Sequence, residues 1–263
     1  MKSLRKSTSW EPVAPWYDKL LAGQDTYQTK VILPNLLRLL PPKGNPKNRD
    51  GLRIIDIACG QGFFSRAYAE EGASQVLGID ISPELIKRAQ QFESPKLRFA
   101  VAPAQQISNA TDASFDAALI ILALQNIKEM PETLREAARV LKPHGTLIIV
   151  LNHPCFRIPH ASAWGFDPTT KTQYRRIDRY GTPCMTKIDM TPGTSRAKDK
   201  VYTVSFHHPL QDYFKALTKA GFSVIGLEEW ISHKQSKPGP RAAAEDAARK
   251  EFPLFVAVVG RRE

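Results

Sequence analysis

LRIIDIACGQGFF, residues 52–64, is the stretch that decides the fold of this chain. It opens with a short apolar run that ends in small residues, which is typical of a buried strand. Gly60 and Gly62 follow, and the pattern then favours a helix over residues 63–71, ended by Gly72. Small residues between a strand and a helix let the backbone pass close to a nucleotide-like ligand. The stretch therefore predicts a strand, a turn and a helix at a ligand site.

The same alternation of strand and helix continues on the carboxyl side. Ser82 offers an N-cap, and Pro83 and Glu84 suit a first helical turn. Strands that alternate with helices predict right-handed crossovers and a parallel sheet. The predicted strands are residues 52–58, 75–80, 96–101, 115–122 and 146–152, and the predicted helices between them are 63–71, 85–92 and 131–141.

The alternation stops after the fifth strand. Residues 153–205 have no clear period and are rich in Pro, Arg and aromatic residues, which predicts a functional insertion such as a lid. Its aromatic and basic side chains could instead form the core of a small cap. Helix, strand, short helix and strand then follow at residues 210–220, 222–230, 242–250 and 254–260.

Composition places the chain among ordinary globular proteins. Its 263 residues are 42% hydrophobic and 24% charged, and no apolar run is long enough to span a membrane. The net charge of +11 comes mainly from residues 1–53 and 153–205, which suggests scattered surface Lys and Arg or a basic rim around a pocket for an acidic substrate. Cys59, Cys155 and Cys184 are few and scattered, so we expect reduced thiols and a cytoplasmic protein without a secretory signal.

Two acids decide how the glycine turn is interpreted. Asp80 closes the second strand, where a carboxylate can accept hydrogen bonds from a ribose diol, as in dinucleotide-binding proteins. Three features favour S-adenosylmethionine over NAD. Asp56 can face the cofactor's amino group, Phe63 and Phe64 occupy the place where a pyrophosphate would need bare amides, and the last elements suit an antiparallel hairpin.

The motifs I-I-D-I-A-C-G-Q-G, G-I-D-I-S and S-F-D-A-A-L-I-I-L-A-L-Q-N-I resemble those of class I S-adenosylmethionine-dependent methyltransferases. R-E-A-A-R-V-L-K-P-H-G-T-L-I-I-V resembles the small-molecule, ubiquinone-biosynthesis-like branch. The resemblance implies an α/β, Rossmann-like doubly wound sheet of about seven strands whose last strand is antiparallel. It also implies S-adenosyl-L-methionine as cofactor and S-adenosyl-L-homocysteine as product.

The resemblance also implies roles for individual residues. Asp56, Gly60 and Gly62 would hold the methionine part, Asp80 the ribose, Ile81 and Ala104-Gln105 the adenine, and Leu122 would lie near the sulfonium. Two positions depart from the pattern. Ala58 replaces the commonest first glycine, and Ala104 stands where many relatives place an acid, which puts the adenine contact in doubt.

The N-terminal Pro15-Trp16-Tyr17-Asp18 resembles an element that folds over the cofactor, with Tyr17 as the contact, or else it is a hydrophobic staple. The expected organisation is therefore an N-terminal helical cap, a methyltransferase domain and a substrate-binding lid. Their ranges are 1–50, 51–152 with 206–263, and 153–205.

The transfer itself needs alignment and a dry pocket, with a general base only for a protonated nucleophile. His153 and His207 are candidate bases, although each could simply cap or pack. Arg157, Trp164 and Tyr174 are candidate substrate contacts. The spacing of His153, Cys155, Cys184, His207 and His208 matches no zinc pattern, so no metal is expected.

We expect a small acidic or aromatic acceptor and no membrane partner. An RNA methyltransferase or RNA-binding relative is the main alternative because of the basic charge, but the fourth strand lacks the Asn/Asp-Pro-Pro-aromatic run of base-methylating enzymes. An NAD-binding oxidoreductase and an inactive Rossmann-like module are further alternatives. The sequence does not indicate the acceptor atom or the oligomeric state.

Overall fold

The computed structural model describes residues 23, 25–43, 50–190 and 200–263, and the following account is confined to them. The helices are α2 (Leu33–Leu39), α3 (Phe63–Glu70), α4 (Pro83–Ala89), α5 (Met130–Val140), α6 (Leu210–Lys219) and α7 (Ala242–Glu251), with the short turn η4 (Leu124–Asn126) after the fourth strand. A π-helical turn, Gln28–Ile32, leads into α2, and a 3-10 turn, Gln90–Phe92, extends α4.

Seven strands of the described chain form one sheet, in the order β10-β11-β5-β4-β1-β2-β3. Neighbours from β5 to β3 are parallel, whereas β11 runs antiparallel to both β5 and β10. The predicted doubly wound sheet with one antiparallel strand at the end of the chain is confirmed. The strands are β10 (Phe222–Trp230), β11 (Phe255–Arg262), β5 (Leu141–Asn152), β4 (Phe115–Ile121), β1 (Arg53–Ile57), β2 (Gln75–Asp80) and β3 (Leu97–Val101).

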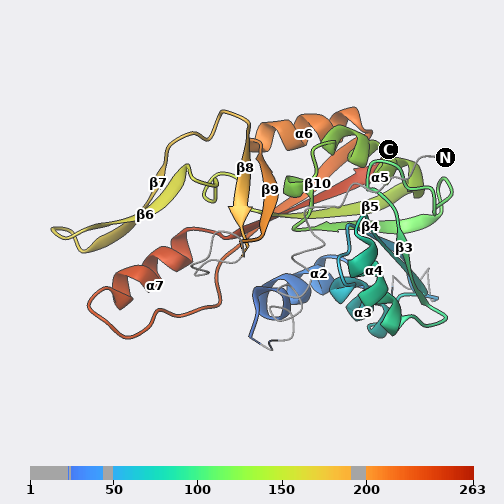
Figure 1. Ribbon diagram of the computed structural model, residues 1–263, viewed down its shortest axis with the longest axis horizontal. Helices are drawn as coiled ribbons and strands as arrows, with labels where there is room; N and C mark the ends of the chain where they lie inside the picture. The colour runs from blue at the N-terminus through green and yellow to red at the C-terminus, as the bar shows by residue number, and fades with distance from the viewer. Residues whose placement is uncertain (1–22, 24, 44–49, 191–199) are drawn as a thin grey trace.

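Helices cover both faces of this sheet. In Figure 1, α2, α3 and α4 lie on one side, and α5 and α6 lie on the other. Each side has its own apolar core, because the side chains of the central strands alternate between the two faces: Ile148 and Val150 face one core, and Ile149 and Leu151 face the other. None of the helices in the described ranges is both long and apolar enough to cross a membrane.

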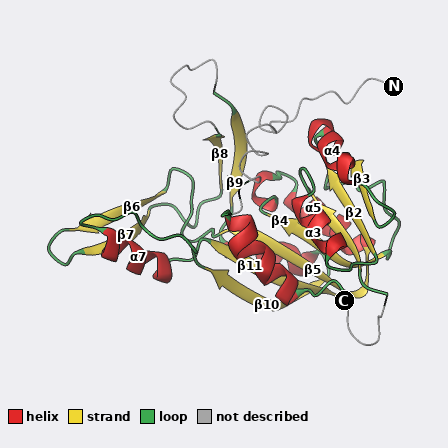
Figure 2. Ribbon diagram, turned by 90° about the horizontal axis from the view of Figure 1, so that it is seen from below, coloured by secondary structure: helices red, strands yellow, loops and turns green. Residues whose placement is uncertain are grey.

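The insertion after β5 contains two β-hairpins that the sequence did not reveal. They are β6 (Ser162–Asp167) with β7 (Thr172–Ile177), and β8 (Cys184–Asp189) with β9 (Tyr202–His207). Along β7 the residues alternate between exposed and half-buried, but Gln173 and Arg175 occupy half-buried positions. Polar side chains there hide the apolar–polar alternation that would predict a strand. Figure 2 shows both hairpins projecting from the sheet, with α7 beside β6 and β7.

The carboxyl ends of the parallel strands meet at one edge of the sheet, where open α/β sheets bind ligands. Five loops gather there because five parallel strands end there. They begin after β1, β2, β3, β4 and β5, and they contain residues 58–62, 81–82, 102–105, 122–126 and 153–157. The candidate site is therefore built from these loops.

Candidate functional site

Asp56 and Ser65 form the innermost part of the edge. Asp56 lies near the end of β1 and is only 1% exposed. The Ser65 hydroxyl, on the first turn of α3, donates a hydrogen bond of 2.6 Å to Asp56 Oδ2. This bond holds the Asp56 carboxylate between the strand and the helix that follows it.

Asp80 ends the neighbouring strand β2 and is also buried. Its Oδ2 accepts a hydrogen bond from the Gly60 amide (2.9 Å), and its Oδ1 accepts one from the Ser82 amide (2.8 Å). Each carboxylate oxygen can accept a second hydrogen bond. The carboxylate is thus fixed across two loops and keeps lone pairs for the two hydroxyls of a diol.

These two buried carboxylates carry the electrostatic character of the site. Burial raises the pKa of Asp56 to about 7; Ser65 opposes the shift and the nearby Asp80 adds to it. Burial likewise raises the pKa of Asp80, against the hydrogen bonds from backbone amides. In the described chain no Lys or Arg accounts for either shift, so a cation arriving at this edge would relieve repulsion between the two acids.

The backbone of the glycine turn adopts left-handed conformations. Ala58, Gly60 and Gly62 have φ values of 59°, 59° and 77°. A Cβ at Gly62 would meet the Phe99 ring at 2.4 Å, so this position requires glycine for space as well as for φ. Ala58 adopts a conformation that glycine would hold without strain, so the replacement of the usual glycine by alanine costs some stability here.

The rest of the predicted cofactor contacts lie on adjacent loops. Ile81 is 46% exposed directly after Asp80, which leaves an apolar side chain free to pack on a ligand. The Ala102 amide donates to the Asp80 carbonyl (3.0 Å). The loop that contains buried Ala104 and half-buried Gln105 therefore begins beside the end of β2. At the end of β4, Leu122 has a φ of 54°, and its amide donates to the Val150 carbonyl (2.7 Å). Tyr17 lies outside the described residues.

Both candidate bases already have protein partners. His153 Nε2 lies 2.6 Å from Glu229 Oε1, and His153 Nδ1 accepts a hydrogen bond from the Cys155 amide (3.2 Å). These contacts assign the proton to Nε2 and leave no nitrogen of His153 free. His207 Nε2 lies 2.8 Å from the Tyr180 carbonyl oxygen, so it donates there. Its remaining nitrogen is the only acceptor the ring could offer to a proton, and its role as a base stays a prediction.

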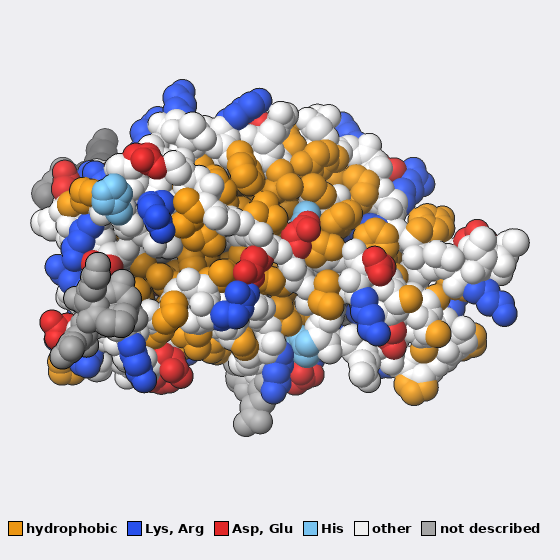
Figure 3. All heavy atoms as spheres, turned by 180° about the vertical axis from the view of Figure 1, so that it is seen from behind, with side chains coloured by type: hydrophobic (Ala, Val, Ile, Leu, Met, Phe, Trp, Pro, Cys, Tyr) orange, Lys and Arg blue, Asp and Glu red, His pale blue; other side chains and the backbone are white. Residues whose placement is uncertain are grey.

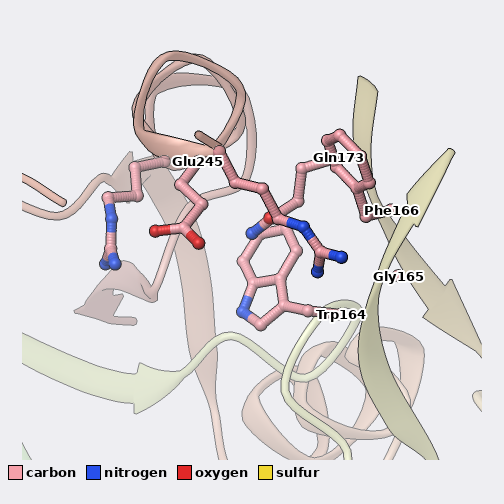
Figure 4. A pocket seen from close by; sticks show the side chains of 7 residues that line it. Trp164, Gly165, Phe166, Gln173 and Glu245 are labelled. Atoms are coloured by element: carbon pink, nitrogen blue, oxygen red, sulfur yellow. The ribbon is translucent and has the colours of Figure 1, made fainter. Parts of the chain in front are cut away.

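Trp164 and Tyr174 lie away from the two acids. Trp164, Phe166 and Gln173 point from β6 and β7 towards Glu245 on α7, around a cavity of about 330 Å³ (Figure 4). The Tyr174 ring covers Gly165 on the other face of the hairpin and is 48% exposed. In both ribbon views this hairpin lies at the opposite end of the molecule from α4 (Figures 1 and 2). Arg157, by contrast, lies on the loop that directly follows β5.

Sequence reasoning assigned no role to two of the residues that shape this edge. Ser65 anchors Asp56, and its signal was a small hydroxyl residue in the first turn of the helix after the glycines. Glu229 holds His153, although 76 residues separate them, and no local pattern could pair them. Contacts between distant strands depend on sheet order, which this sequence alone does not specify at residue level.

Comparison with known proteins agrees with this geometry. Residues 55–149 match the family model described as a methyltransferase domain. This span includes the carboxyl end of β1, all of β2, both acids and the glycine turn. The chain contains a class I methyltransferase domain. Outside residues 55–149, the sheet of this methyltransferase domain is completed by β10 and β11.

Relatives of the methyltransferase domain are similar over part of their length. A ubiquinone biosynthesis O-methyltransferase of Xanthomonas campestris pv. campestris is 35% identical over 102 residues, which are 38% of this chain and 42% of the relative. A demethylmenaquinone methyltransferase of Renibacterium salmoninarum is 30% identical over 151 residues, 56% of this chain and 59% of the relative. The chain thus spans about half the length of these curated relatives.

A solved structure extends the similarity to most of the chain. The S-adenosylmethionine-dependent methyltransferase from Mesorhizobium loti superposes with a TM-score of 0.66 at 28% identity, over 87% of this chain and 96% of that one. The similarity of fold therefore extends well beyond residues 55–149.

Proposed function

We propose that this chain is an enzyme that transfers a methyl group from S-adenosyl-L-methionine to a small-molecule acceptor. One observation carries the proposal: two buried carboxylates, Asp56 and Asp80, face a glycine turn at the carboxyl edge without a basic partner in the described chain. The cofactor carries an α-ammonium and a sulfonium, and both are cations. The methyltransferase domain and the related solved structure support the same cofactor.

Each residue at the edge has a part in this proposal. Asp80 accepts hydrogen bonds from the ribose diol. Asp56 attracts the cofactor's ammonium, which lies against the turn formed by Ala58, Gly60 and Gly62. Ile81 packs on the adenine beside Ala104 and Gln105, whereas Leu122 lies next to the sulfonium. When bound, the cofactor supplies an electrophilic methyl group. The protein aligns the acceptor with it and excludes water.

The acceptor is proposed to be an aromatic or acidic small molecule. The names of two relatives indicate quinone biosynthesis for those proteins, and the start of the insertion supplies Phe156 and Arg157 directly after β5. A hydroxyl acceptor would need a base. Of the two candidates we propose His207, because both ring nitrogens of His153 are bonded within the protein. The scattered cysteines are the ground for proposing a cytoplasmic location.

Nucleic acid is the less favoured acceptor. Figure 3 shows one face of the molecule, where hydrophobic side chains occupy much of the middle and Lys and Arg are interspersed with Asp and Glu among the described residues. A nucleic-acid surface would gather basic side chains along a stripe. The charges on this face therefore give no support to an RNA-binding surface there.

Calorimetric titration tests the proposal with two ligands. We expect micromolar binding of S-adenosyl-L-homocysteine, loss of that binding in Asp80→Ala, and no heat with NADH. Binding of NADH alone would replace the proposal with an oxidoreductase, and binding of neither ligand would favour an inactive module.

A further inference from the structure

Arg157 lies at the carboxyl edge of the sheet, after β5 and therefore away from Asp56 and Asp80 on β1 and β2. It lies in the loop that leaves β5, and its amide donates to the His153 carbonyl (2.8 Å), which closes one helical turn at the end of the strand. This turn places Arg157 beyond β5 and next to the loops that hold Leu122 and η4 in the order of the sheet. In open α/β sheets, ligands bind outside this carboxyl edge.

The guanidinium of Arg157 has no hydrogen-bond or ion-pair partner in the described chain. The residue is exposed, yet the protein atoms around it displace part of its water, and this desolvation lowers the pKa of the guanidinium while Tyr27 opposes the shift. A partly desolvated cation without a counter-ion favours a ligand that supplies one.

Arg175 adds a second positive charge to the same place. Its Nε donates to the Phe156 carbonyl (2.8 Å), and its Nη2 donates to the Ser162 hydroxyl (2.7 Å). Both partners are neutral, and the repulsion from Arg157 contributes to a lowered pKa of Arg175, second to desolvation. The fold therefore holds two like charges together with no carboxylate between them.

Acids on the neighbouring segments are already engaged. Asp25 pairs with Lys234 and with His233, and Glu229 pairs with His153. These carboxylates are thus satisfied elsewhere, and none of them neutralises the two arginines in the structure.

Two aromatic side chains, those of Phe156 and Tyr27, belong to the surroundings of Arg157. The Phe156 ring packs against the His153 ring at 4.7 Å between centroids, immediately before Arg157 in the chain. Tyr27 packs edge-on against Phe255 at 5.6 Å and interacts electrostatically with Arg157. A planar apolar ring that carries an anionic group matches these surroundings better than a flexible aliphatic anion.

We propose that Arg157, supported by Arg175, binds the carboxylate of an aromatic acid and thereby selects an acidic methyl acceptor. The inference rests on the proposed function, because it assigns the acceptor side of the same edge. Arg157 donates two hydrogen bonds to the carboxylate through its planar fork, and Arg175 raises the positive potential from its fixed position. Arg175 is a positioning residue here, since its own donors are bound to Phe156 and Ser162.

The test compares benzoate with benzamide as probes at constant ionic strength, by thermal unfolding and by calorimetry in the presence of S-adenosyl-L-homocysteine. Benzamide keeps the ring and removes the charge. We expect benzoate to raise the unfolding temperature and benzamide to leave it unchanged. Arg157→Gln should weaken benzoate binding about tenfold or more, whereas Arg157→Lys should restore part of it.

Arg179→Gln is the matched control, because Arg179 is an exposed arginine of the same insertion whose side chain has no hydrogen-bond or ion-pair partner in the described chain. It should bind benzoate as the parent does. Equal responses to benzoate and benzamide, or equal behaviour of Arg157→Gln and Arg179→Gln, would overturn the assignment. Binding of S-adenosyl-L-homocysteine is read in the same samples: its retention in Arg157→Gln separates a failed anion site from a failed methyltransferase proposal.

Discussion

The two halves of the carboxyl edge carry opposite charge. At the carboxyl ends of β1 and β2 the edge is acidic, and its acids are buried: Asp56 and Asp80 are each held by hydrogen bonds. Beyond β5 the edge is basic and shallow: Arg157 is exposed, and Arg175 is tied only to neutral groups. A single sheet edge thus offers an anionic place for the cationic cofactor and, under our proposal, a cationic place for an anionic acceptor.

The difference in depth matters as much as the difference in sign. A buried carboxylate interacts strongly with a ligand charge because little water screens it, whereas an exposed guanidinium is screened. We therefore expect substitutions on the acidic side to have large effects on cofactor binding. Substitutions on the basic side should mainly change which acceptor is preferred.

Of the substitutions considered, Asp80→Asn should have the largest effect, and it should act on cofactor binding at the acidic half of the edge. The amide keeps the shape of the side chain but loses the charge and one acceptor for the ribose diol. We expect S-adenosyl-L-homocysteine to bind about 100-fold more weakly, since each hydrogen bond to a charged group contributes about 1.5–3 kcal/mol. Calorimetry measures the change. Asp178→Asn, which removes an exposed acid paired with Arg176, is the control and should bind normally.

Asp56→Asn should expose the pH dependence of the acidic half. The pKa of Asp56 is about 7 in the folded chain and near 3.8 when unfolded, so between these values the folded state binds more protons. Stability of the ligand-free protein should therefore fall as pH rises from about 4 to 7. Cofactor affinity should rise over the upper part of this range, by up to about tenfold per pH unit, because the ammonium prefers the carboxylate.

Unfolding and calorimetric curves at several pH values check this prediction. In Asp56→Asn both slopes should flatten, and the variant should be more stable than the parent at pH 8. Identical slopes in the two proteins would mean that other groups control the acidic half.

His153→Gln tests whether His153, which follows β5, stabilises the fold or acts as a base. Both ring nitrogens of His153 are bonded within the protein, and burial lowers its pKa against the influence of Glu229. Its neutral form therefore stabilises the fold above about pH 6.5, and this contribution is lost as pH falls. We expect a loss of about 1–3 kcal/mol in unfolding free energy, with less than a tenfold change in kcat. A drop of 100-fold in kcat at unchanged stability would instead identify His153 as a base.

Ala58→Gly should have the smallest effect. Ala58 has a φ of 59°, and a left-handed alanine is strained by about 1 kcal/mol relative to glycine. The greater freedom of glycine in the unfolded chain offsets part of this gain. We expect the unfolding temperature to rise by no more than about 3 °C, with cofactor binding unchanged. A fall in stability would show that the Ala58 methyl group contributes to packing.

The sequence predicted the sheet half of the molecule closely. Residues 75–80 and 222–230 were predicted as strands and are β2 and β10 with the same limits. Burial on both faces gives the central strands continuous apolar runs, and Gly, Pro and Ser limit the helices. These signals are local, so a single sequence is enough to detect them.

The insertion shows where such prediction ends. The β6–β7 and β8–β9 hairpins expose much of their surface, and their partly buried faces include Gln173, Arg175 and Thr186. Trp164 was predicted as a substrate contact from its type alone, yet it packs against Phe252 and Arg175 beside α7. Partners of this kind are chosen by tertiary packing across large sequence distances. The predicted lid role and the domain limits stay predictions.

The position of β11 affects how the chain folds during its synthesis on the ribosome. β11 follows β10 in the chain but lies between β10 and β5 in the sheet. While the chain is being synthesised, β5 must wait with an open apolar edge until residues 255–262 have emerged, and β10 has no place to dock before then. Unpaired edges of this kind attract other chains. The nascent protein is therefore most vulnerable to aggregation just before β11 appears, and chaperone protection would be most useful in that interval.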